Sequence, residues 1–154
     1  MHISSTLNPD ECRTLLESER YGHLGCTADG DVYVLPVTYA YKNNAIYAYT
    51  HEGKKVDMMR KNPNVCLQVE KVDMPKGWES VICWGVYEEL TDPAQLKEGQ
   101  FLLAERFAEQ WKERGAITTF SPLVEDLSEV IEGRPAVVYR INIDRMTGKR
   151  RTFG

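Results

Sequence analysis

The segment between residues 49 and 55 holds the side chains best suited to binding chemistry. A predicted strand ends there in the hydroxyl of Thr50 and the imidazole of His51, the chain turns through Gly53, and Lys54 and Lys55 begin a helix. The backbone amides at a helix N-terminus, the positive end of the helix dipole and neighbouring ammonium groups together attract anions. The segment therefore suits a phosphate group, although the same pattern also begins many charged, solvated surface helices.

The four cysteines, Cys12, Cys26, Cys66 and Cys83, give no sign of a metal or redox site. No two of them form the C-x-x-C pair that zinc ribbons and thioredoxin-like sites use. Cys66 and Cys83 lie within apolar runs, so we interpret them as reduced thiols that pack as small hydrophobic side chains. The sequence therefore predicts no metal-binding residues.

Composition and charge narrow the class of protein. The chain has 154 residues, of which 42% are hydrophobic and 27% charged, and this predicts one globular domain over residues 1–154. Its formal net charge of -4 disfavours nucleic-acid binding, which depends on a basic surface. No run approaches the roughly 18 apolar residues that span a bilayer, and the first residues lack the pattern of a signal peptide. We therefore expect a cytoplasmic protein that binds neither nucleic acid nor membranes.

The elements that must position these residues follow from periodicity and turn signals. Asn8, Pro9 and Glu11 have the spacing of a capping box with proline at the first helical position, so a helix begins here. Residues 64–70 alternate apolar and polar side chains, as a half-buried strand does. The predicted strands are residues 22–28, 32–41, 45–50, 64–70, 80–90 (with a bulge at Gly85) and 136–143, the later helices are 54–61 and 93–114, residues 116–135 are irregular, and 147–154 form a basic tail.

These elements predict a mainly β fold with flanking helices. Six strands joined mostly by hairpin-length turns indicate a small six-stranded antiparallel β-barrel. Pro36 cannot donate to a strand ladder, so it marks the strand 32–41 as an edge, a bulge or a ligand-facing break. That strand carries apolar side chains on both faces, and a barrel interior covers only one of them. We therefore expect a homodimer in which a second copy covers the other face.

Several short motifs follow one another at spacings typical of one family. They are Gly22-His23-Leu24-Gly25, Val34-Leu35-Pro36-Val37-Thr38-Tyr39, Ile46-Tyr47-Ala48-Tyr49-Thr50-His51, Gly53-Lys54-Lys55, Arg60-Lys61-Asn62-Pro63-Asn64-Val65, and Glu79-Ser80-Val81 with the strand end Gly85-Val86-Tyr87-Glu88-Glu89-Leu90. In this order they resemble the FMN-binding split β-barrels related to pyridoxamine 5'-phosphate oxidase, and more narrowly the nitroimidazole-resistance-like branch.

The resemblance implies that FMN is the cofactor and that it lies at the interface of a homodimer. Lys54 and Lys55 would hold its phosphate, and Ser80 occupies a position at which oxidases of the family carry a glutamine that reaches the cofactor. Two more groups are implied: Tyr49, Thr50 and His51 beside the phosphate and ribityl chain, and the backbone of Leu35, Pro36, Val37 and Thr38 along the isoalloxazine edge. His51 is either catalytic or a plain hydrogen-bond donor, and the catalytic residues stay unknown.

The sequence also departs from the oxidases of this family. Those begin the flavin-edge strand with an arginine where this chain has Val34, and they use a serine-arginine-lysine phosphate motif where it has Gly53-Lys54-Lys55. The tail contains Lys149, Arg150 and Arg151 but lacks the tryptophan that meets flavin and substrate in those enzymes. We therefore expect an FMN-dependent oxidoreductase that reduces a small substrate such as a nitroaromatic compound. The alternatives are pyridoxamine phosphate oxidation and a non-catalytic haem- or flavin-binding role.

Overall fold

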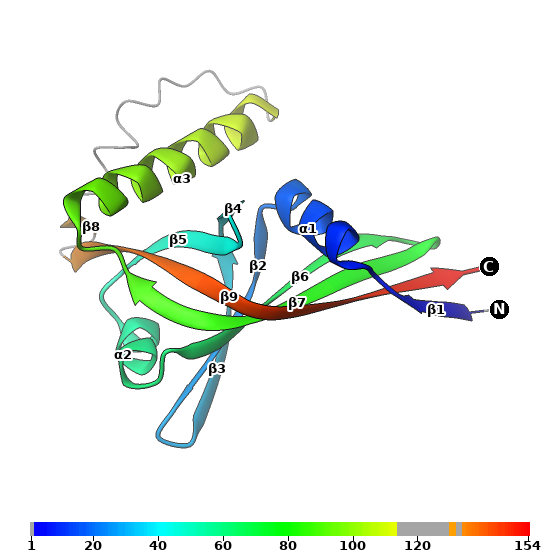
Figure 1. Ribbon diagram of the computed structural model, residues 1–154, viewed down its shortest axis with the longest axis horizontal. Coiled ribbons are helices and arrows are strands. Elements are labelled where there is room, and N and C mark those ends of the chain that lie inside the picture. The colour runs from blue at the N-terminus through cyan, green and yellow to red at the C-terminus, as the bar shows by residue number, and fades with distance from the viewer. Residues whose placement is uncertain (1, 114–129, 132–133) are drawn as a thin grey trace.

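The computed structural model describes residues 2–113, 130–131 and 134–154, which form a strongly bent antiparallel sheet with helices around it (Figure 1). In chain order the elements are β1 (His2–Thr6), α1 (Pro9–Ser18), β2 (Tyr21–Ala28), β3 (Asp31–Thr38), β4 (Ala40–Lys42), β5 (Ala45–His51), α2 (Lys54–Lys61), β6 (Asn64–Asp73), β7 (Gly77–Glu89), α3 (Pro93–Glu113), β8 (Val130–Ile131) and β9 (Arg134–Phe153).

The order of strands across the sheet brings its two ends back together. The order is β3-β2-β6-β7-β9-β5-β4, and β1 and β8 also pair with β9. β3 and β4 stand at opposite ends of this order, yet only Tyr39 separates them in the chain. The sheet therefore turns back on itself at Tyr39, as the wall of a barrel does. Among the described strands β3 pairs with β2 alone, so its other edge is open.

Tyr39 is fixed at this corner by two hydrogen bonds. Its side chain is fully buried, and its hydroxyl donates to the carbonyl of Leu16 at the end of α1, 2.8 Å away. Its backbone amide donates to the carbonyl of Arg20, 2.9 Å away. A buried hydroxyl needs such a partner, because an unpaired one costs free energy. The same residue thus anchors α1 and the corner between β3 and β4.

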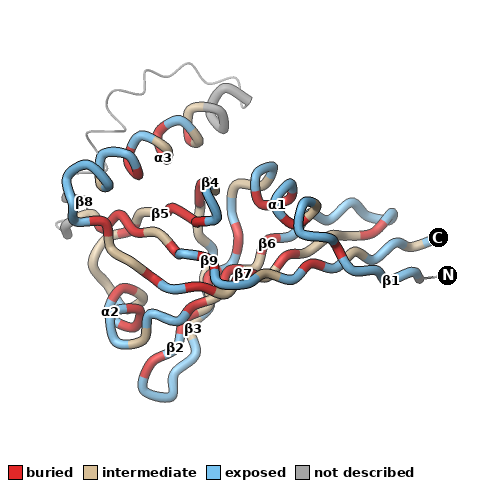
Figure 2. The backbone as a smooth tube through the Cα atoms, in the orientation of Figure 1, coloured by how far each residue is buried: buried red, intermediate tan, exposed pale blue. Residues whose placement is uncertain are grey.

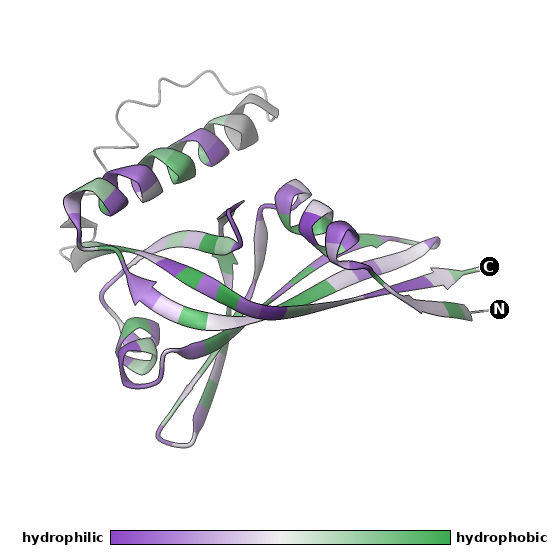
Figure 3. Ribbon diagram, viewed as in Figure 1, coloured by the Kyte–Doolittle hydropathy of each residue, from purple (hydrophilic) through white to green (hydrophobic). Residues whose placement is uncertain are grey.

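The buried side chains form two clusters. The larger one lies between the sheet, α1 and α2, and it includes the fully buried Leu16, Met59 and Leu67. The smaller one lies under α3, where Leu103 packs with Val138 of β9. Buried and exposed segments alternate along the strands in Figure 2. α1 and α3 carry both hydrophobic and hydrophilic segments in Figure 3, as helices with one covered face do.

The predicted fold class and several predicted details are confirmed. The capping box of α1 is present, because the amide of Glu11 donates to Asn8 Oδ1 and the amide of Asn8 donates to Glu11 Oε1. The register between β7 and β9 also shifts at the expected position, between Trp84 and Gly85, and the extra residue is Asp144 of β9. A Cβ atom at Gly85 would lie 2.3 Å from the carbonyl oxygen of Asn142, so a larger residue does not fit there.

The predicted number of strands, six, is too low, because the structure has nine in the described residues. The strand predicted over 32–41 is two strands, since Tyr39 turns the chain between them. β1 was missed because its residues 3–6 are all exposed and therefore show no alternation. The basic tail 147–154 is instead the end of β9, which pairs there with β1 and β7.

The segment predicted to be irregular, 116–135, is described only in part. Residues 130–131 form β8, which pairs with the first residues of β9. Residues 116–129 and 132–133 lie outside the described part of the chain, so the prediction for them stays a prediction. The predicted helix 93–114 corresponds to α3, which continues through Gly99.

Candidate functional site

The turn between β5 and α2 has the features that attract an anion. β5 ends at His51, and α2 begins at Lys54 after the residues Glu52 and Gly53. Gly53 is the N-cap, its backbone is extended with φ 173°, and no side chain caps the helix. The first amides of a helix have no partner within the helix itself. At α2 these amides are therefore open to a ligand, beside two lysines.

The two lysines lie in different surroundings. Lys54 is exposed, and its Nζ atom lies 5.1 Å from the centre of the Tyr33 ring on β3. Lys55 is half-buried, and this burial lowers the pKa of its ammonium group. The buried Cys26 of β2 lies near it. Lys54 is thus turned toward β3, whereas Lys55 is turned toward the inner side of β2.

A cavity of about 710 Å³ opens beside this turn. Gly53 and Lys54 line it from α2, and Asp29 and Asp31 line it from the β2–β3 turn. Two of the carboxylates around it are paired with cations from the last turn of α2: Lys61 Nζ lies 2.9 Å from Asp29 Oδ2, and the Arg60 guanidinium binds Glu52. The pairing cancels negative charge that would otherwise oppose an anion at the turn.

The predicted flavin-edge segment lies on the open edge of the sheet. Leu35, Val37 and Thr38 are half-buried and Pro36 is exposed, and all four belong to β3. Pro36 lies opposite His23 of β2. The structure therefore confirms that Pro36 belongs to an edge strand, as its missing amide proton requires. The backbone on the free side of β3 can bond to a ligand because no described strand pairs with it.

The structure divides Tyr49, Thr50 and His51 between two faces of β5. Tyr49 is half-buried and packs edge-on against Phe107 of α3, with the ring centres 5.6 Å apart. Thr50 is buried, and its hydroxyl lies 3.4 Å from the carbonyl oxygen of His51. Successive residues of a strand point to opposite sides, so His51 shares the face of Tyr49 and Thr50 does not. His51 is half-buried.

Ser80 is not close to this turn within one chain. It lies on β7 and accepts a hydrogen bond from Gln68 Nε2 at 3.1 Å. The β9 residue that pairs with Ser80 is Lys149, and the β9 residue that pairs with His51 is Ala136. At ~3.3 Å per residue these two positions are separated by roughly 40 Å of strand. A ligand shared by Ser80 and the turn would have to be held between two copies of the chain.

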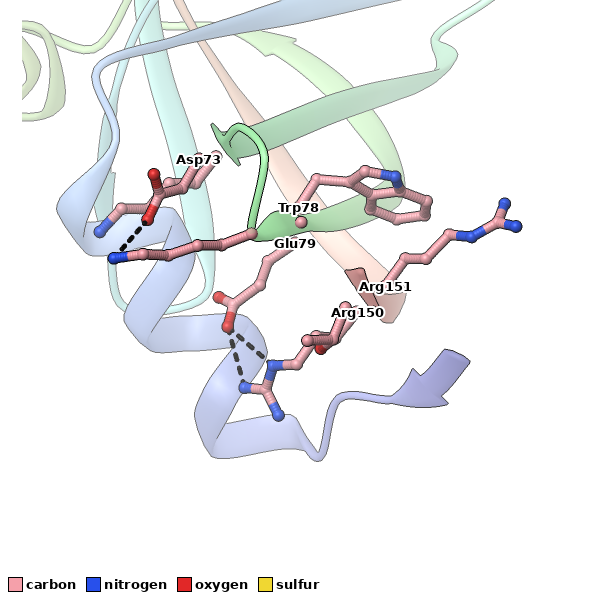
Figure 4. A pocket seen from close by; sticks show the side chains of 9 residues that line it. Asp73, Trp78, Glu79, Arg150 and Arg151 are labelled. Atoms are coloured by element: carbon pink, nitrogen blue, oxygen red, sulfur yellow. Dashed lines mark hydrogen bonds and ion pairs between the residues drawn. The ribbon is translucent and has the colours of Figure 1, made fainter. Parts of the chain in front are cut away.

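The end of β9 is engaged in ion pairs rather than free (Figure 4). Arg150 Nη2 lies 2.7 Å from Glu11 Oε2 of α1, and Arg150 also binds Glu79 of β7. Hydrogen bonds from the Asn8 backbone and from Arg150 lower the pKa of Glu11. In Figure 4, Trp78 and Arg151 point to the opposite side of the strands from Glu79 and Arg150. In the predicted basic tail, Arg150 is thus held by two carboxylates from α1 and β7.

Arg60 is a residue whose role the sequence did not indicate. Arg60 is exposed, yet it binds Glu52 in the turn and Glu89 at the end of β7. The eight-residue spacing between Glu52 and Arg60 carries no standard helix-pair signal, and Glu89 comes from a distant strand. Only the fold brings these three charges together.

Within residues 2–113, 130–131 and 134–154, no three His, Cys, Asp or Glu side chains gather as metal ligands. In the same ranges no helix is both long and apolar enough to cross a bilayer.

Comparison with known proteins relates this geometry to a family. A family model described as pyridoxamine 5'-phosphate oxidase matches residues 8–150. The chain belongs to this family. Among curated proteins it is 28% identical over 152 residues to an uncharacterized protein of Rhizobium meliloti (strain 1021), covering 96% of this chain and 95% of that one.

Two of the matching solved structures have the same fold. The crystal structure of an FAD-binding protein from Mesorhizobium loti is 30% identical, has a TM-score of 0.76, and is aligned over 99% of this chain and 100% of that one. A candidate 5-nitroimidazole antibiotic resistance protein from Bacteroides thetaiotaomicron is 20% identical, with a TM-score of 0.74 over 100% of this chain and 93% of that one. The second likeness shows the fold alone. The predicted family and split-barrel fold are confirmed.

The first prediction concerns the half-buried lysine of the turn. Because burial disfavours its ammonium form, we expect Lys55 to lose its proton at a lower pH than an ordinary lysine, whose pKa is about 10.4. The pH dependence of the ¹³Cε chemical shift measures this pKa, and a Lys55→Gln variant assigns the signal. A midpoint at or above the ordinary value would show that Lys55 is solvated in the folded protein.

Proposed function

We propose that the protein is a flavin-dependent oxidoreductase that binds FMN with its phosphate at the β5–α2 turn. The observation that carries the proposal is the uncapped N-terminus of α2, with Lys54 beside it in contact with the Tyr33 ring of the edge strand β3. The backbone amides and the ammonium group supply charge-assisted hydrogen bonds to a phosphate. The edge of β3 supplies backbone groups for a flat heteroaromatic ring.

The comparisons support a flavin as the ligand. The Mesorhizobium loti protein, which is 30% identical over its whole length, is named for FAD binding. We favour FMN for this chain because of the charge of the cavity beyond Lys54. Asp31 and Asp57 line that cavity, and neither is within an ion pair that the structure describes. A second phosphate, such as that of FAD, would lie among these carboxylates.

We propose the following roles for the predicted side chains. The turn with Lys54 and Lys55 would bind the phosphate, and His51 at the end of β5 would reach the phosphate or ribityl chain as a hydrogen-bond donor. The backbone of residues 35–38 would orient the isoalloxazine ring. Bound flavin supplies the electron and hydride transfer, and the protein holds and shields it. Tyr49 packs against Phe107 of α3, so we propose no direct contact between Tyr49 and the flavin.

The substrate class follows from the openness of the flavin edge. Pro36 on this edge is exposed, and the neighbouring side chains are mostly apolar. Such a surface accepts flat, weakly held electron acceptors, of which nitroaromatic compounds are one class. Oxidation of pyridoxamine phosphate needs a second phosphate clamp, and Arg150 is already bound to Glu11 and Glu79. We therefore propose reduction of a small aromatic acceptor rather than pyridoxamine phosphate oxidation.

The outer face of β2, β3 and β7 supports a homodimer. Val32 is 76% and Val34 61% exposed, although both are apolar strand residues. They line a groove of about 410 Å³ together with Trp84 and Cys66. Soluble monomers rarely expose continuous apolar surface of this kind. A second copy of the chain would cover it and would bring its own Ser80 toward the flavin of the first.

The flavin proposal is tested with the double variant Lys54→Ala/Lys55→Ala. Each charge-assisted hydrogen bond contributes ~1.5–3 kcal/mol, so we expect FMN affinity to fall by at least about tenfold while the circular dichroism spectrum is unchanged. The control is Lys71→Ala/Lys76→Ala, which removes two exposed lysines of the β6–β7 hairpin and should leave the affinity unchanged.

Wild-type protein decides the identity of the chromophore in the same experiment. A flavin doublet in the absorbance spectrum, with FMN released on denaturation, supports the proposal, and release of FAD would overturn the choice of FMN. A Soret band would favour the haem-binding alternative. If the wild type and the Lys54/Lys55 double variant bind FMN with equal affinity, the phosphate does not bind at this turn.

The dimer proposal is tested with Val34→Glu. We expect wild-type protein to sediment as a dimer at micromolar concentration and the variant as a monomer, because an unpaired carboxylate is costly to bury in an apolar interface. Phe101→Glu on α3, where the phenyl ring is 57% exposed, is the matched control and should stay dimeric. Monomeric wild-type protein, or a dimeric Val34→Glu variant, would contradict the assignment of this face.

A further inference from the structure

Arg60 connects the β5–α2 turn to the wall of the sheet. Its Nη1 and Nη2 atoms lie 2.8 and 2.7 Å from the two carboxylate oxygens of Glu52, so the pair is bidentate. Its Nε and Nη2 atoms also contact Glu89 at the end of β7. One guanidinium group at the C-terminal end of α2 thus binds the residue just before the N-terminal end of the same helix.

The second carboxylate of this group is itself held in place. Tyr87 is buried, and its hydroxyl donates to Glu89 Oε1 at 2.9 Å. The Tyr87 ring packs against that of Tyr139, with ring centres 5.2 Å apart. The hydrogen bonds of Arg60 lower the pKa of Glu89, so this carboxylate stays ionised at neutral pH. Arg60 is therefore held in place through Glu89 by the buried Tyr87.

Arg60 can influence a ligand at the turn through its partner Glu52. Glu52 lines the same cavity as Gly53 and Lys54, and its side chain is 36% exposed. An unpaired carboxylate next to the open amides of α2 would repel a phosphate and would attract the Lys54 ammonium group. In the structure the carboxylate is bound in a fork to Arg60 instead, as guanidinium groups favour.

We propose that Arg60 is a positioning residue for the phosphate site, which acts by holding and neutralising Glu52. This proposal rests on the proposed flavin function and adds to it a determinant of phosphate affinity that does not touch the ligand. Riboflavin carries the same ring and ribityl chain as FMN but no phosphate, so its affinity should not depend on Arg60.

The test compares the affinities of FMN and riboflavin for wild-type protein and for Arg60→Gln at low ionic strength, where exposed charges are least screened. We expect Arg60→Gln to weaken FMN binding about tenfold, equivalent to ~1.4 kcal/mol, and to leave riboflavin affinity within about twofold. Adding Glu52→Gln to this variant removes the carboxylate that Arg60 neutralises and should restore most of the FMN affinity. A general loss of structure would weaken both flavins together and would not be reversed by Glu52→Gln.

The chain offers a closely matched control. Arg140 makes a bidentate pair with Glu88, the residue next to Glu89 on β7, with Arg140 Nη2 2.9 Å from Glu88 Oε1. Arg140→Gln breaks an ion pair of the same type away from the turn, and both flavin affinities should stay unchanged. Arg60→Lys keeps the positive charge beside Glu52 and should retain most of the FMN affinity. If Arg60→Gln does not fold, Arg60→Met, which also lacks the positive charge, replaces it and should show the same selective loss of FMN affinity.

The outcomes separate this proposal from the one on which it rests. If wild-type protein binds neither flavin, the proposed function fails and Arg60 has no phosphate site to position. If wild-type protein prefers FMN but Arg60→Gln binds FMN equally well, only the role of Arg60 is overturned. The same holds if Arg60→Gln weakens both flavins equally, or if Glu52→Gln restores nothing.

Discussion

The hydrogen bond from the Tyr39 hydroxyl to the Leu16 carbonyl holds the corner on which the site depends. At this corner the first and last strands of the sheet order, β3 and β4, are joined through a single residue. β4 and β5 follow β3 in the chain, yet β3 forms no ladder with β5 in the described residues. An edge strand with unpaired backbone groups is normally a liability in a folded protein. Here it leaves hydrogen-bonding groups available at the side of the sheet where the β5–α2 turn carries its amides and lysines.

An acidic chain can build an anion site only by controlling the charges around it. The protein has a formal net charge of -4, and four carboxylates, those of Asp29, Asp31, Glu52 and Asp57, line the cavity beside Lys54. The last turn of α2 supplies the two cations that pair with two of them, Lys61 with Asp29 and Arg60 with Glu52. Such exposed pairs contribute little to stability. Their effect on the local potential at the turn is the more important consequence of their placement.

The sequence predicted those parts of the fold that depend on local signals. The capping box at Asn8, the alternation over residues 64–70 and the bulge at Gly85 are all confirmed, because each is set by residues close together in the chain or by a steric need of its own. β1 was missed because exposed polar residues have no pattern, and the break at Tyr39 was missed because its cause is a hydrogen bond to α1. The ion pairs of Arg150 in the predicted basic tail were missed for the same reason, since its partners come from α1 and β7.

In the candidate site, too, the sequence predicted the local features but not those that depend on tertiary contacts. Gly53 and Lys54 could be predicted from the strand–glycine–helix pattern, and the structure places them together beside β3. The contributions of Arg60 and Glu89 could not, since they meet only through tertiary folding. Nor could the strand faces of Tyr49 and Thr50 be assigned without knowing that α3 covers one side of β5.

A crystal structure of the protein with bound FMN tests most directly whether the β5–α2 turn holds the phosphate of a flavin. We expect the phosphate oxygens to lie within hydrogen-bond distance of the first backbone amides of α2 and of Lys54 Nζ, with the ring along residues 35–38 of β3. A phosphate bound elsewhere, for example at the arginines at the end of β9, would contradict this expectation.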